Sequence, residues 1–247
     1  MRGHIGFSNQ SISNIRKSDE AAYSQITSLK QTTGFDSAGT LEVGVGYQFN
    51  NWVRADVTAQ YRGSANFHGS DVFSAMAYGG QYSGVDIYQA RKTEWLFLTN
   101  VYFDLGTWWG VTPFLGAGIG TARVNISNFT DSGAVSPYID GISCTATAPC
   151  PGVYPGFATA ESGSKWNFAW ATHAGLAYQI NSSTTLELAY SYINLGSGTT
   201  GVISDFTGYN GGNVMKFKDI TSHDLKFGVR WMLDAPTSWL TPPLSGG

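Results

Sequence analysis

Apolar and polar residues alternate with a period of two through much of this 247-residue chain. From 41 to 49, Leu, Val, Val, Tyr and Phe occupy the odd positions, and Glu, Gly, Gly and Gln occupy the even ones. Successive side chains of a strand point to opposite faces, so this pattern predicts a strand with one apolar and one polar face. The Asn50-Asn51 pair that follows is a turn signal, and 53–61 alternates again, which predicts a β-hairpin.

Six further segments repeat this alternation, and together they predict an all-β fold of eight strands. Gly makes up 31 of the 247 residues, and Gly at this level weakens helices. The apolar runs are also much shorter than the roughly 20 residues of a membrane-spanning helix. An even number of antiparallel strands is typical of closed membrane barrels. The predicted strands are 2–8, 41–49, 53–61, 93–105, 112–123, 166–180, 185–194 and 221–233.

Short and long connections alternate between these strands. The short ones lie at 50–51, 106–111 and 181–184, and the long polar ones at 9–38, 63–92, 124–165 and 195–219. Short turns on one rim and long loops on the other are the arrangement of outer-membrane barrels. We therefore predict an eight-stranded antiparallel transmembrane β-barrel over 1–233, with short periplasmic turns, four long extracellular loops and a periplasmic tail over 234–247. Some of these long segments are expected to hold short strand extensions or a helical turn, and Glu20–Leu29 is the best candidate for a helix.

Two kinds of barrel remain possible, and they differ in which strand face points inward. A soluble ligand-binding barrel would line its cavity with the apolar face, whereas a membrane barrel turns that face to lipid. Glycines such as Gly116 and Gly118 lie on the polar face, where they would weaken a water-exposed strand but make room in a narrow lumen. Trp residues gather near both rims, as in the aromatic girdles of membrane barrels. The predicted girdle residues are Trp52, Trp95, Trp108, Trp109, Trp166, Trp170 and Trp231. These features favour the membrane barrel.

The inward-facing positions carry charges of both signs, which predicts a charge network in the lumen. Lone buried charges are costly, so we expect opposite charges to pair. Position along the strands suggests Arg54 with Asp104 and Glu187 with Arg230, and a second cluster nearer the loops formed by Glu42, Arg62, Glu94, Asp224 and Lys226. The predicted network contains Glu42, Arg54, Asp56, Arg62, Glu94, Asp104, Glu187, Asp224, Lys226 and Arg230. Such a network either plugs the barrel or lines a narrow, gated pore.

The sequence offers little sign of catalytic or metal chemistry. The formal net charge of −3 gives no basic footprint for nucleic acid. None of the four histidines has the Cys or carboxylate spacing of a metal site. Ser222-His223 is the one candidate dyad, but adjacent strand residues face opposite sides. We therefore expect no enzyme activity, no metal and no cofactor.

Cys144 and Cys150 lie in one short segment of the third long loop. A local disulfide between them fits an oxidising compartment, and two free loop thiols are the alternative. The chain shows no signal peptide, and the segment after Met1 already alternates like a strand. We expect that Met1 replaces an export signal that is cleaved from the precursor.

Several segments together resemble the outer-membrane β-barrel surface-antigen family, which includes the opacity proteins and the Omp25/Omp31-like proteins of alphaproteobacteria. They are Arg-Gly-His-Ile-Gly-Phe at 2–7, Thr-Pro-Phe-Leu-Gly-Ala-Gly-Ile-Gly at 112–120, Leu-Glu-Leu-Ala-Tyr-Ser-Tyr-Ile-Asn-Leu-Gly at 186–196 and the closing His-Asp-Leu-Lys-Phe-Gly-Val-Arg-Trp at 223–231. The resemblance covers about 2–233 and implies envelope structure, surface exposure and in some members adhesion or immune contact. It implies no catalytic residue. Many such barrels end at an aromatic residue that the assembly machinery reads, a role that would fall here to Trp231 or the residues after it.

We therefore expect a multi-pass barrel of the outer membrane with a structural or surface-interaction role in the cell envelope. The alternatives are a narrow porin or channel for small solutes or apolar molecules, and more remotely a soluble ligand-binding barrel. Leu96, Leu98 and Phe114 on the inward face would suit an apolar conduit. The expected partners are outer-membrane lipid including lipopolysaccharide, the barrel-assembly machinery and an envelope or surface protein, but no nucleic acid.

Overall fold

The computed structural model describes residues 1–19, 24–77, 80–138 and 152–233. These residues form eleven β-strands in a single antiparallel sheet. The strands are β1 (Arg2–Ser11), β2 (Asn14–Lys17), β3 (Ile26–Phe35), β4 (Ala38–Gln48), β5 (Val53–Ala77), β6 (Gly80–Asp104), β7 (Val111–Tyr138), β8 (Tyr154–Ala160), β9 (Gly163–Gln179), β10 (Thr184–Asp205) and β11 (Val214–Trp231).

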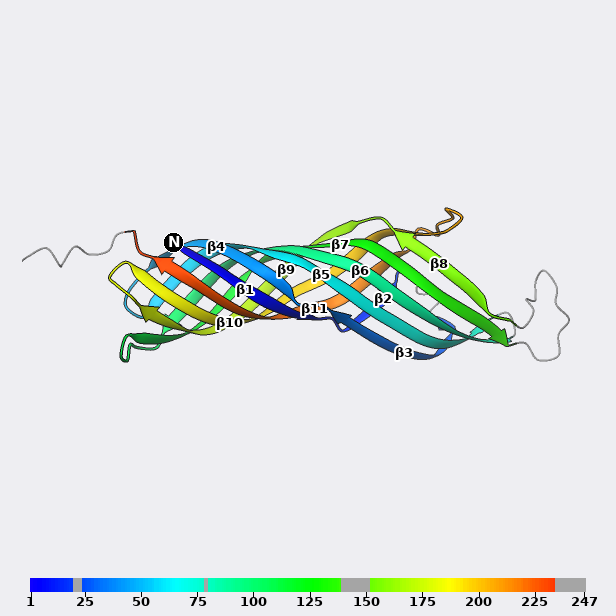
Figure 1. Ribbon diagram of the computed structural model, residues 1–247, viewed down its shortest axis with the longest axis horizontal. Helices are drawn as coiled ribbons and strands as arrows, with labels where there is room; N and C mark the ends of the chain where they lie inside the picture. Colours follow the sequence, from blue (N-terminus) through cyan, green and yellow to red (C-terminus); the bar gives the residue numbers. More distant parts are fainter. Residues whose placement is uncertain (20–23, 78–79, 139–151, 234–247) are drawn as a thin grey trace, which may run out of the picture.

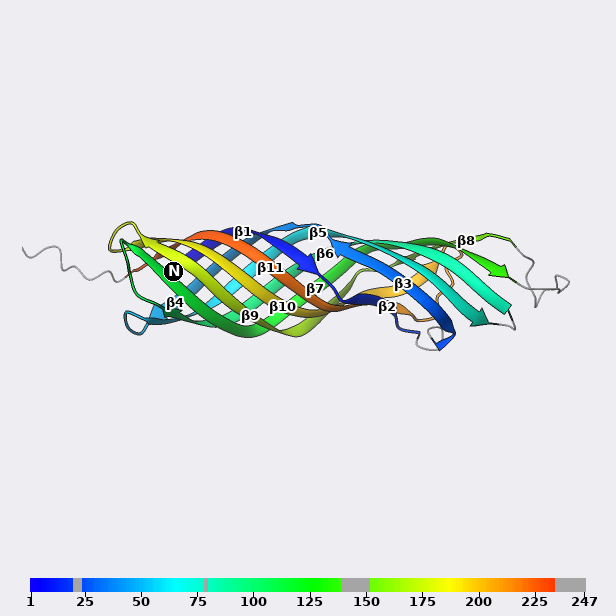
Figure 2. The same ribbon diagram turned by 90° about the horizontal axis from the view of Figure 1, so that it is seen from below.

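Eight of the strands close into a barrel. Backbone pairing runs from β1 through β4, β5, β6, β7, β9, β10 and β11 and returns to β1. Figures 1 and 2 show one elongated, twisted barrel, with the N-terminus at one end and β3 and β8 towards the other. The predicted eight-stranded antiparallel barrel is therefore confirmed.

Several strands run far beyond their predicted ends. β5 and β6 each contain 25 residues and β7 contains 28, whereas a strand that crosses a bilayer needs about 9–11. The prediction of long loops at 63–92, 124–165 and 195–219 was thus largely wrong, because strands occupy most of these segments. Many of their outward positions hold Ser, Thr, Gln or Asn, and large apolar residues are fewer than on the base barrel, so the alternation is much weaker there.

The prediction of a long loop over 9–38 was also wrong in part. β2 and β3 occupy much of 9–38, and Ile26–Leu29 belong to β3 rather than to a helix. Residues 20–23 of the predicted helix lie outside the described residues. β-branched Ile26 and Thr27 at the start of β3 favour a strand over a helix.

Beyond the eight-strand ring, three short strands replace three ring strands and prolong the barrel. β3 pairs with β5 where β4 has ended, β8 lies between β7 and β10 where β9 has yet to begin, and β2 pairs with β11 beyond β1. We call the section that contains β1, β4 and β9 the base barrel, and the section that contains β2, β3 and β8 the extension. Between β2 and β3, the Gln31 side chain donates to the carbonyl of Ile15 at 3.1 Å and accepts from its N–H at 3.0 Å.

Local chemistry explains the three short turns, which all lie at the same end of the base barrel. The Asn50 side chain accepts hydrogen bonds from the backbone N–H groups of Trp52 and Val53. Asn181 does the same for Ser183 and Thr184. Such Asx turns let a side chain replace backbone pairing. The β6–β7 turn instead uses positive φ angles, including 112° at Gly106 and 81° at Gly110, which glycine adopts readily.

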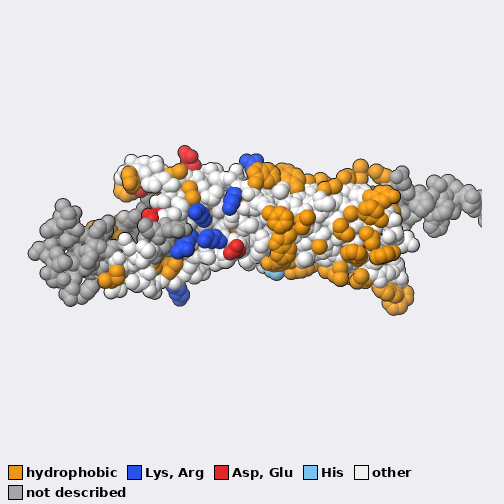
Figure 3. Space-filling view, turned by 180° about the vertical axis from the view of Figure 1, so that it is seen from behind, with side chains coloured by type: hydrophobic (Ala, Val, Ile, Leu, Met, Phe, Trp, Pro, Cys, Tyr) orange, Lys and Arg blue, Asp and Glu red, His pale blue; other side chains and the backbone are white. Residues whose placement is uncertain are grey.

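The outer face changes character along the barrel. Figure 3 shows hydrophobic side chains that are dense over the base barrel and sparse over the extension. Exposed apolar residues such as Val43, Phe103 and Leu115 cover the base barrel at 48–58% exposure. A soluble protein rarely exposes so large an apolar surface, which therefore marks an interaction with another apolar phase. Within the described residues, no helix has the length and hydropathy of a membrane span.

Candidate functional site

Charged side chains that point inward fill the lumen of the base barrel. Towards the short-turn end, Arg2 Nη2 lies 2.8 Å from Glu42 Oε1, and Arg2 Nη1 lies 3.1 Å from Asp56 Oδ2. Lys226 Nζ donates to the other Glu42 oxygen at 2.9 Å. All four side chains are more than nine-tenths buried. Opposite charges must meet here, because an unpaired charge in such a site costs several kcal/mol.

Glu187 is shared among three basic side chains beside this group. Its Oε2 lies 3.0 Å from His4 Nε2, while its Oε1 lies 3.4 Å from Arg54 Nη2 and 3.2 Å from Arg230 Nη1. The two arginine contacts have ion-pair distances without hydrogen-bond geometry. Arg54 also reaches Asp104 through its Nε at 3.3 Å. Glu187 therefore holds side chains from β1, β5 and β11 together.

A second charge cluster lies deeper in the lumen, around Arg62. This guanidinium is completely buried. Its Nε donates to Glu94 at 2.9 Å, its Nη1 donates to Asp224 at 2.6 Å, and its Nη2 donates to the hydroxyls of Ser8 and Ser222. Lys92 Nζ lies 2.5 Å from the other Glu94 oxygen. Hydrogen bonds on every side compensate for the loss of water around these charges.

Small residues beside large ones explain how the lumen accommodates these side chains. A Cβ added to Gly116 would collide with the ring of Tyr102, and one added to Gly228 would collide with the ring of His4. The Tyr102 ring is in turn held by the guanidinium of Arg54, 4.2 Å from its centroid. The inward glycines therefore make room for side chains of the neighbouring strand.

Beyond the charge clusters, the interior becomes apolar. Phe67 and Phe217 are fully buried with ring centroids 5.0 Å apart, and Phe35 lies 5.2 Å from Phe67. Leu96 and Leu98, which the sequence predicts to face inward, are buried in the same cluster. Phe114 packs instead against Tyr102, nearer the short-turn end. These buried contacts make a solid core of the kind found in soluble domains.

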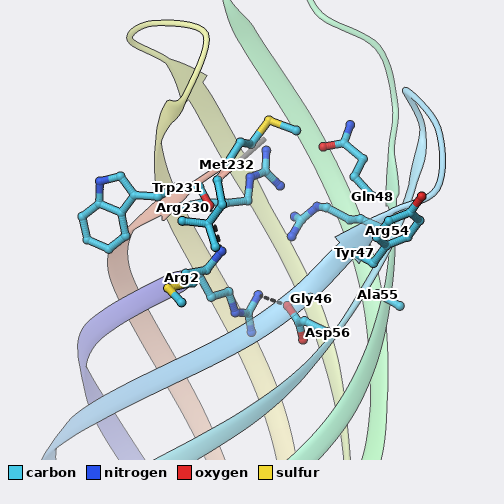
Figure 4. A pocket seen from close by; sticks show the side chains of 12 residues that line it. Arg2, Gly46, Tyr47, Gln48, Arg54, Ala55, Asp56, Arg230, Trp231 and Met232 are labelled. Atoms are coloured by element: carbon cyan, nitrogen blue, oxygen red, sulfur yellow. Dashed lines mark hydrogen bonds and ion pairs between the residues drawn. The ribbon is translucent and has the colours of Figure 1, made fainter. Parts of the chain in front are cut away.

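One cavity opens at the short-turn end, with a volume of about 440 Å³. Figure 4 shows Arg2, Arg54 and Arg230 around it, with the Arg2–Asp56 ion pair on one side. Met232 and Trp231 form part of its apolar rim. Deeper in the lumen, a cavity beside Tyr102 and His173 measures about 10 Å³, roughly the space that one water molecule needs. Of these two cavities, the wide one lies at the mouth.

The structure places all ten residues of the predicted charge network inside the barrel, with Arg230 the least buried. It brings together Arg54 with Asp104 and Glu187 with Arg230. The predicted second cluster is divided, because Glu42 and Lys226 pair with each other and with Arg2, away from Arg62. The sequence analysis missed Arg2, Lys92 and the paired role of His4. Arg2 occupies an inward-facing position on the strand beside Glu42, and this position could have revealed it. Lys92 lies in a segment that was predicted as a loop.

The predicted girdle residues are all at least one-third exposed, from Trp170 at 38% to Trp109 at 97%. Trp52, Trp108, Trp109 and Trp231 lie in or beside the short-turn end. At the other limit of the apolar surface, Trp95 stacks on Phe97, which stacks on Trp166, with centroids 6.2 Å apart in each pair. Trp170 packs on Tyr192 in a tilted arrangement, with ring centroids 5.6 Å apart.

The candidate dyad is separated by the barrel wall. Ser222 is buried in the lumen against Arg62, while His223 faces outward, where its Nδ1 lies 2.6 Å from the Tyr190 hydroxyl. Among the described residues, no group of three or more His, Cys, Asp or Glu side chains is placed to hold a metal. Cys144 and Cys150 lie outside the described residues, as does the predicted tail over 234–247.

Three acidic side chains meet inside the extension, on β5, β6 and β7. The Tyr88 hydroxyl lies 3.2 Å from both Asp71 and Asp86, and Gln31 donates to Asp71 at 2.9 Å. Lys17 pairs with Asp131 at 3.0 Å. Burial raises the pKa of Asp71 and of Asp86, and the nearby charge of Asp131 raises both further. The polar groups thus lie across the interior of the extension, beside its apolar core.

Comparison with known proteins supplies the family of this barrel. Residues 7–232 match the family model described as the outer membrane protein beta-barrel domain. The chain belongs to this family. As an outer membrane protein it lies in the outer membrane, where the apolar surface of its base barrel faces lipid. The short-turn end is then periplasmic and the extension extracellular.

The relatives of this outer membrane protein are distant. An uncharacterized protein of Brucella abortus (strain 2308) is 29% identical over 165 residues, 63% of this chain and 51% of that protein. The chain thus spans about half the length of the first relatives it matches. Outer membrane protein PagN of Salmonella typhimurium is 28% identical over 182 residues, 72% of this chain and 65% of PagN. Among solved structures, outer membrane protein OprG from Pseudomonas aeruginosa matches with a TM-score of 0.45 at 12% identity, covering 93% of this chain and 94% of OprG.

Proposed function

We propose that this outer membrane protein binds a partner at the cell surface through the tip of its extension, and that it neither conducts solutes nor catalyses a reaction. The observation that carries the proposal is the combination of a packed interior with strands more than twice the length that a bilayer needs. A pore gains nothing from a long extracellular wall around a solid core. A binding protein gains a rigid support that holds its loops above the membrane.

The β10–β11 connection is the best described contact point on the extracellular side of the extension. Phe206 and Tyr209 are 78% and 73% exposed. Asp205, just before Phe206, closes this turn: its Oδ1 accepts from the Thr207 hydroxyl at 2.6 Å and from the backbone N–H groups of Thr207 and Tyr209. The Thr207 hydroxyl bond, followed by the backbone donors, lowers the pKa of Asp205. A preformed turn that presents exposed aromatic rings matches the anchors that dominate protein interfaces.

A binding assay tests this role. Bacteria that display the protein would be scored for attachment to fibronectin, laminin and collagen surfaces and for aggregation with one another. We expect Phe206→Ala with Tyr209→Ala to reduce attachment or aggregation at least tenfold, since aromatic anchors each contribute about 2 kcal/mol or more. The matched control is Ile87→Ala, which removes a half-exposed apolar side chain from the wall of the extension. Equal loss in both variants, or loss in neither, would contradict the proposal.

A narrow pore is the second candidate, because the cavity at the periplasmic mouth opens one end of the lumen. Arg54 and Arg230 separate that mouth from the interior, so Arg54→Ala with Arg230→Ala would widen any conduit. We expect no single-channel current in a planar bilayer from the wild-type protein or from this variant. Discrete currents that the variant enlarges would favour the pore over the binding role.

The proposed absence of catalysis is supported by the geometry of its one candidate dyad. The barrel wall lies between the Ser222 hydroxyl and the His223 imidazole, so the imidazole has no path to deprotonate the hydroxyl. Ser222→Ala should therefore leave lipid hydrolysis and acyl transfer at the level of protein-free vesicles, as the wild type does. Phospholipid or lipopolysaccharide turnover that Ser222→Ala abolishes would overturn this part of the proposal.

A further inference from the structure

The charges of this chain are sorted between the inside and the outside of the barrel. Within the described residues, the exposed side chains include six Lys or Arg but three Asp or Glu, although the whole chain is formally negative. The fully buried charges show the opposite balance, with five basic and eight acidic side chains. The exposed basic residues are Arg16, Lys30, Arg91, Arg123, Lys165 and Lys216. The outer wall is therefore basic, while the acidic excess is hidden inside.

These exposed basic residues also occupy one part of the wall. All lie at or beyond the extracellular limit of the apolar surface, on strands β2, β3, β6, β7, β9 and β11. Figure 3 shows Lys and Arg side chains gathering where the dense hydrophobic surface ends. We define the basic belt as Arg16, Arg91, Arg123, Lys165 and Lys216, and leave out Lys30, which stands opposite Val72, further up the extension.

Arg123 joins the belt directly to the upper aromatic residues. In the strand register it stands opposite Trp95 on one side and Trp166 on the other. Its guanidinium lies 6.0 Å from the centroid of the Trp166 ring. Lys165 precedes Trp166 on β9, and its Nζ is 2.6 Å from the Ser197 hydroxyl. Cations thus stand where indole rings mark the boundary between hydrocarbon and headgroups.

A second part of the belt brings basic side chains of two strands side by side. Arg16 on β2 stands directly opposite Lys216 on β11, and both side chains are exposed. Lys218, two residues further along β11, adds a third cation to the same strand face. Like charges directly opposite each other destabilise a sheet. An anionic headgroup placed between these cations would lower their repulsion, so they form a second part of the same basic surface.

We propose that the basic belt binds the phosphate groups of the phosphorylated glycolipid of the outer leaflet, lipopolysaccharide. The belt begins at the aromatic boundary and touches several strands around the barrel, so lipids that surround the protein can place their phosphates on it while their acyl chains cover Trp95, Phe97 and Trp166. Charge-assisted bonds from Arg and Lys to phosphate hold each headgroup. This lipid contact is independent of the proposed binding at the tip of the extension.

The test measures binding of fluorescent lipopolysaccharide that lacks its outer polysaccharide to the full chain in nonionic detergent. We expect Arg123→Gln with Lys165→Gln, and separately Arg16→Gln with Lys216→Gln, to weaken binding about fivefold for each charge removed. The control, Lys30→Gln, removes one exposed charge beyond the belt and should bind like the wild type. Circular dichroism and the gel shift between folded and heated protein verify that each variant forms the barrel.

Two further probes decide which chemistry the belt recognises. The same lipid after enzymatic removal of its phosphates should bind as weakly as the variants, and raised salt should weaken the binding of the intact lipid. Unchanged binding in the belt variants, or equal binding of the dephosphorylated lipid, would overturn the proposal. Heparin that binds as tightly as the lipid and is lost in the same variants would also overturn it, because the belt would then serve a soluble polyanion.

Discussion

The base barrel and the extension are continuous strands with opposite chemistry. On β5, Gln60 and Arg62 point inward and Val57 and Tyr61 point outward within the base barrel. Further along the same strand, Phe67 points inward and Asn66 and His68 point outward. The base barrel is thus polar inside and apolar outside, while the extension is built like a soluble domain. The change takes place at the upper aromatic residues, where the surrounding lipid ends.

This difference shows that alternation fixes the strand and its two faces, while the surrounding phase decides which face is apolar. Contact with lipid stabilises large apolar side chains on the outer face of the base barrel. Its narrow lumen is filled by paired charges and small residues. In water, polar residues outside and apolar residues inside are favoured, because burial of apolar surface is then the main source of stability. Each section should therefore respond to a different kind of substitution.

The largest expected loss of stability follows the removal of a central charge from the base barrel. Arg62→Ala would leave Glu94 and Asp224 buried without their main partner, and such broken pairs cost about 3–5 kcal/mol. Unfolding of the protein in urea, in lipid vesicles, would measure the loss. Arg123→Ala removes an exposed arginine and should change stability by less than about 0.5 kcal/mol. Similar results for both variants would mean that the buried charges do not stabilise the base barrel.

The next effect separates the two sections of the molecule. Phe129 is buried in the extension, where it stands opposite Ala160 of β8, and Phe129→Ala should cost about 3 kcal/mol through lost burial and the cavity left behind. Because the extension has its own apolar core, we expect hydrogen exchange to speed up at amides of 66–77 and 81–90 but not at those of 54–60. Faster exchange in both sets of amides would show that the two sections unfold as one unit.

A smaller effect tests the packing of the polar lumen. Gly116→Ala would place a methyl group against the Tyr102 ring, which the Arg54 guanidinium and Phe114 prevent from moving aside. Overpacking of this kind costs about 1–3 kcal/mol. Gly39→Ala on β4 meets open space and should change stability by less than about 1 kcal/mol. Thermal unfolding of both variants in one detergent gives the comparison, and equal melting temperatures would show that the lumen has room to spare.

The sequence was sufficient to predict the base barrel, because the two faces of its strands differ strongly in polarity. Val43 and Val45 against Gly44 and Gly46 define a strand, its faces and its register without tertiary information. The pair of Arg54 and Asp104 could be predicted for the same reason, since both are inward-facing charges on neighbouring strands at equal depth. Glycine on the polar face correctly indicated a crowded lumen, as the contact of Gly228 with His4 illustrates.

The extension could not be recognised from the sequence, because the two faces of its strands differ only weakly in polarity. Ser70, Ser83 and Ser132 stand at outward positions where the base barrel has Val or Phe, and such segments look like polar loops. Lys92 was missed for that reason. The contact of Arg2 with Asp56 depends on how far the barrel twists between β1 and β5, which are not adjacent in the ring. Register and closure, not residue type, determine such contacts.

The smallest expected effect is a change of stability with pH, confined to the extension. Asp71 and Asp86 have pKa values raised by burial and by Asp131, so the folded extension favours their protonated forms. A raised folded pKa stabilises the fold below the ordinary Asp pKa of about 3.9, and this gain is lost as the pH rises through the raised value. We therefore expect hydrogen exchange of amides 66–77, corrected for intrinsic rates, to be slower at pH 4 than at pH 7. Asp71→Asn with Asp86→Asn is the decisive control, because this variant has lost both carboxyl groups and should no longer exchange more slowly at pH 4 than at pH 7. Slower exchange at pH 4 in the variant as well would assign the effect to other groups.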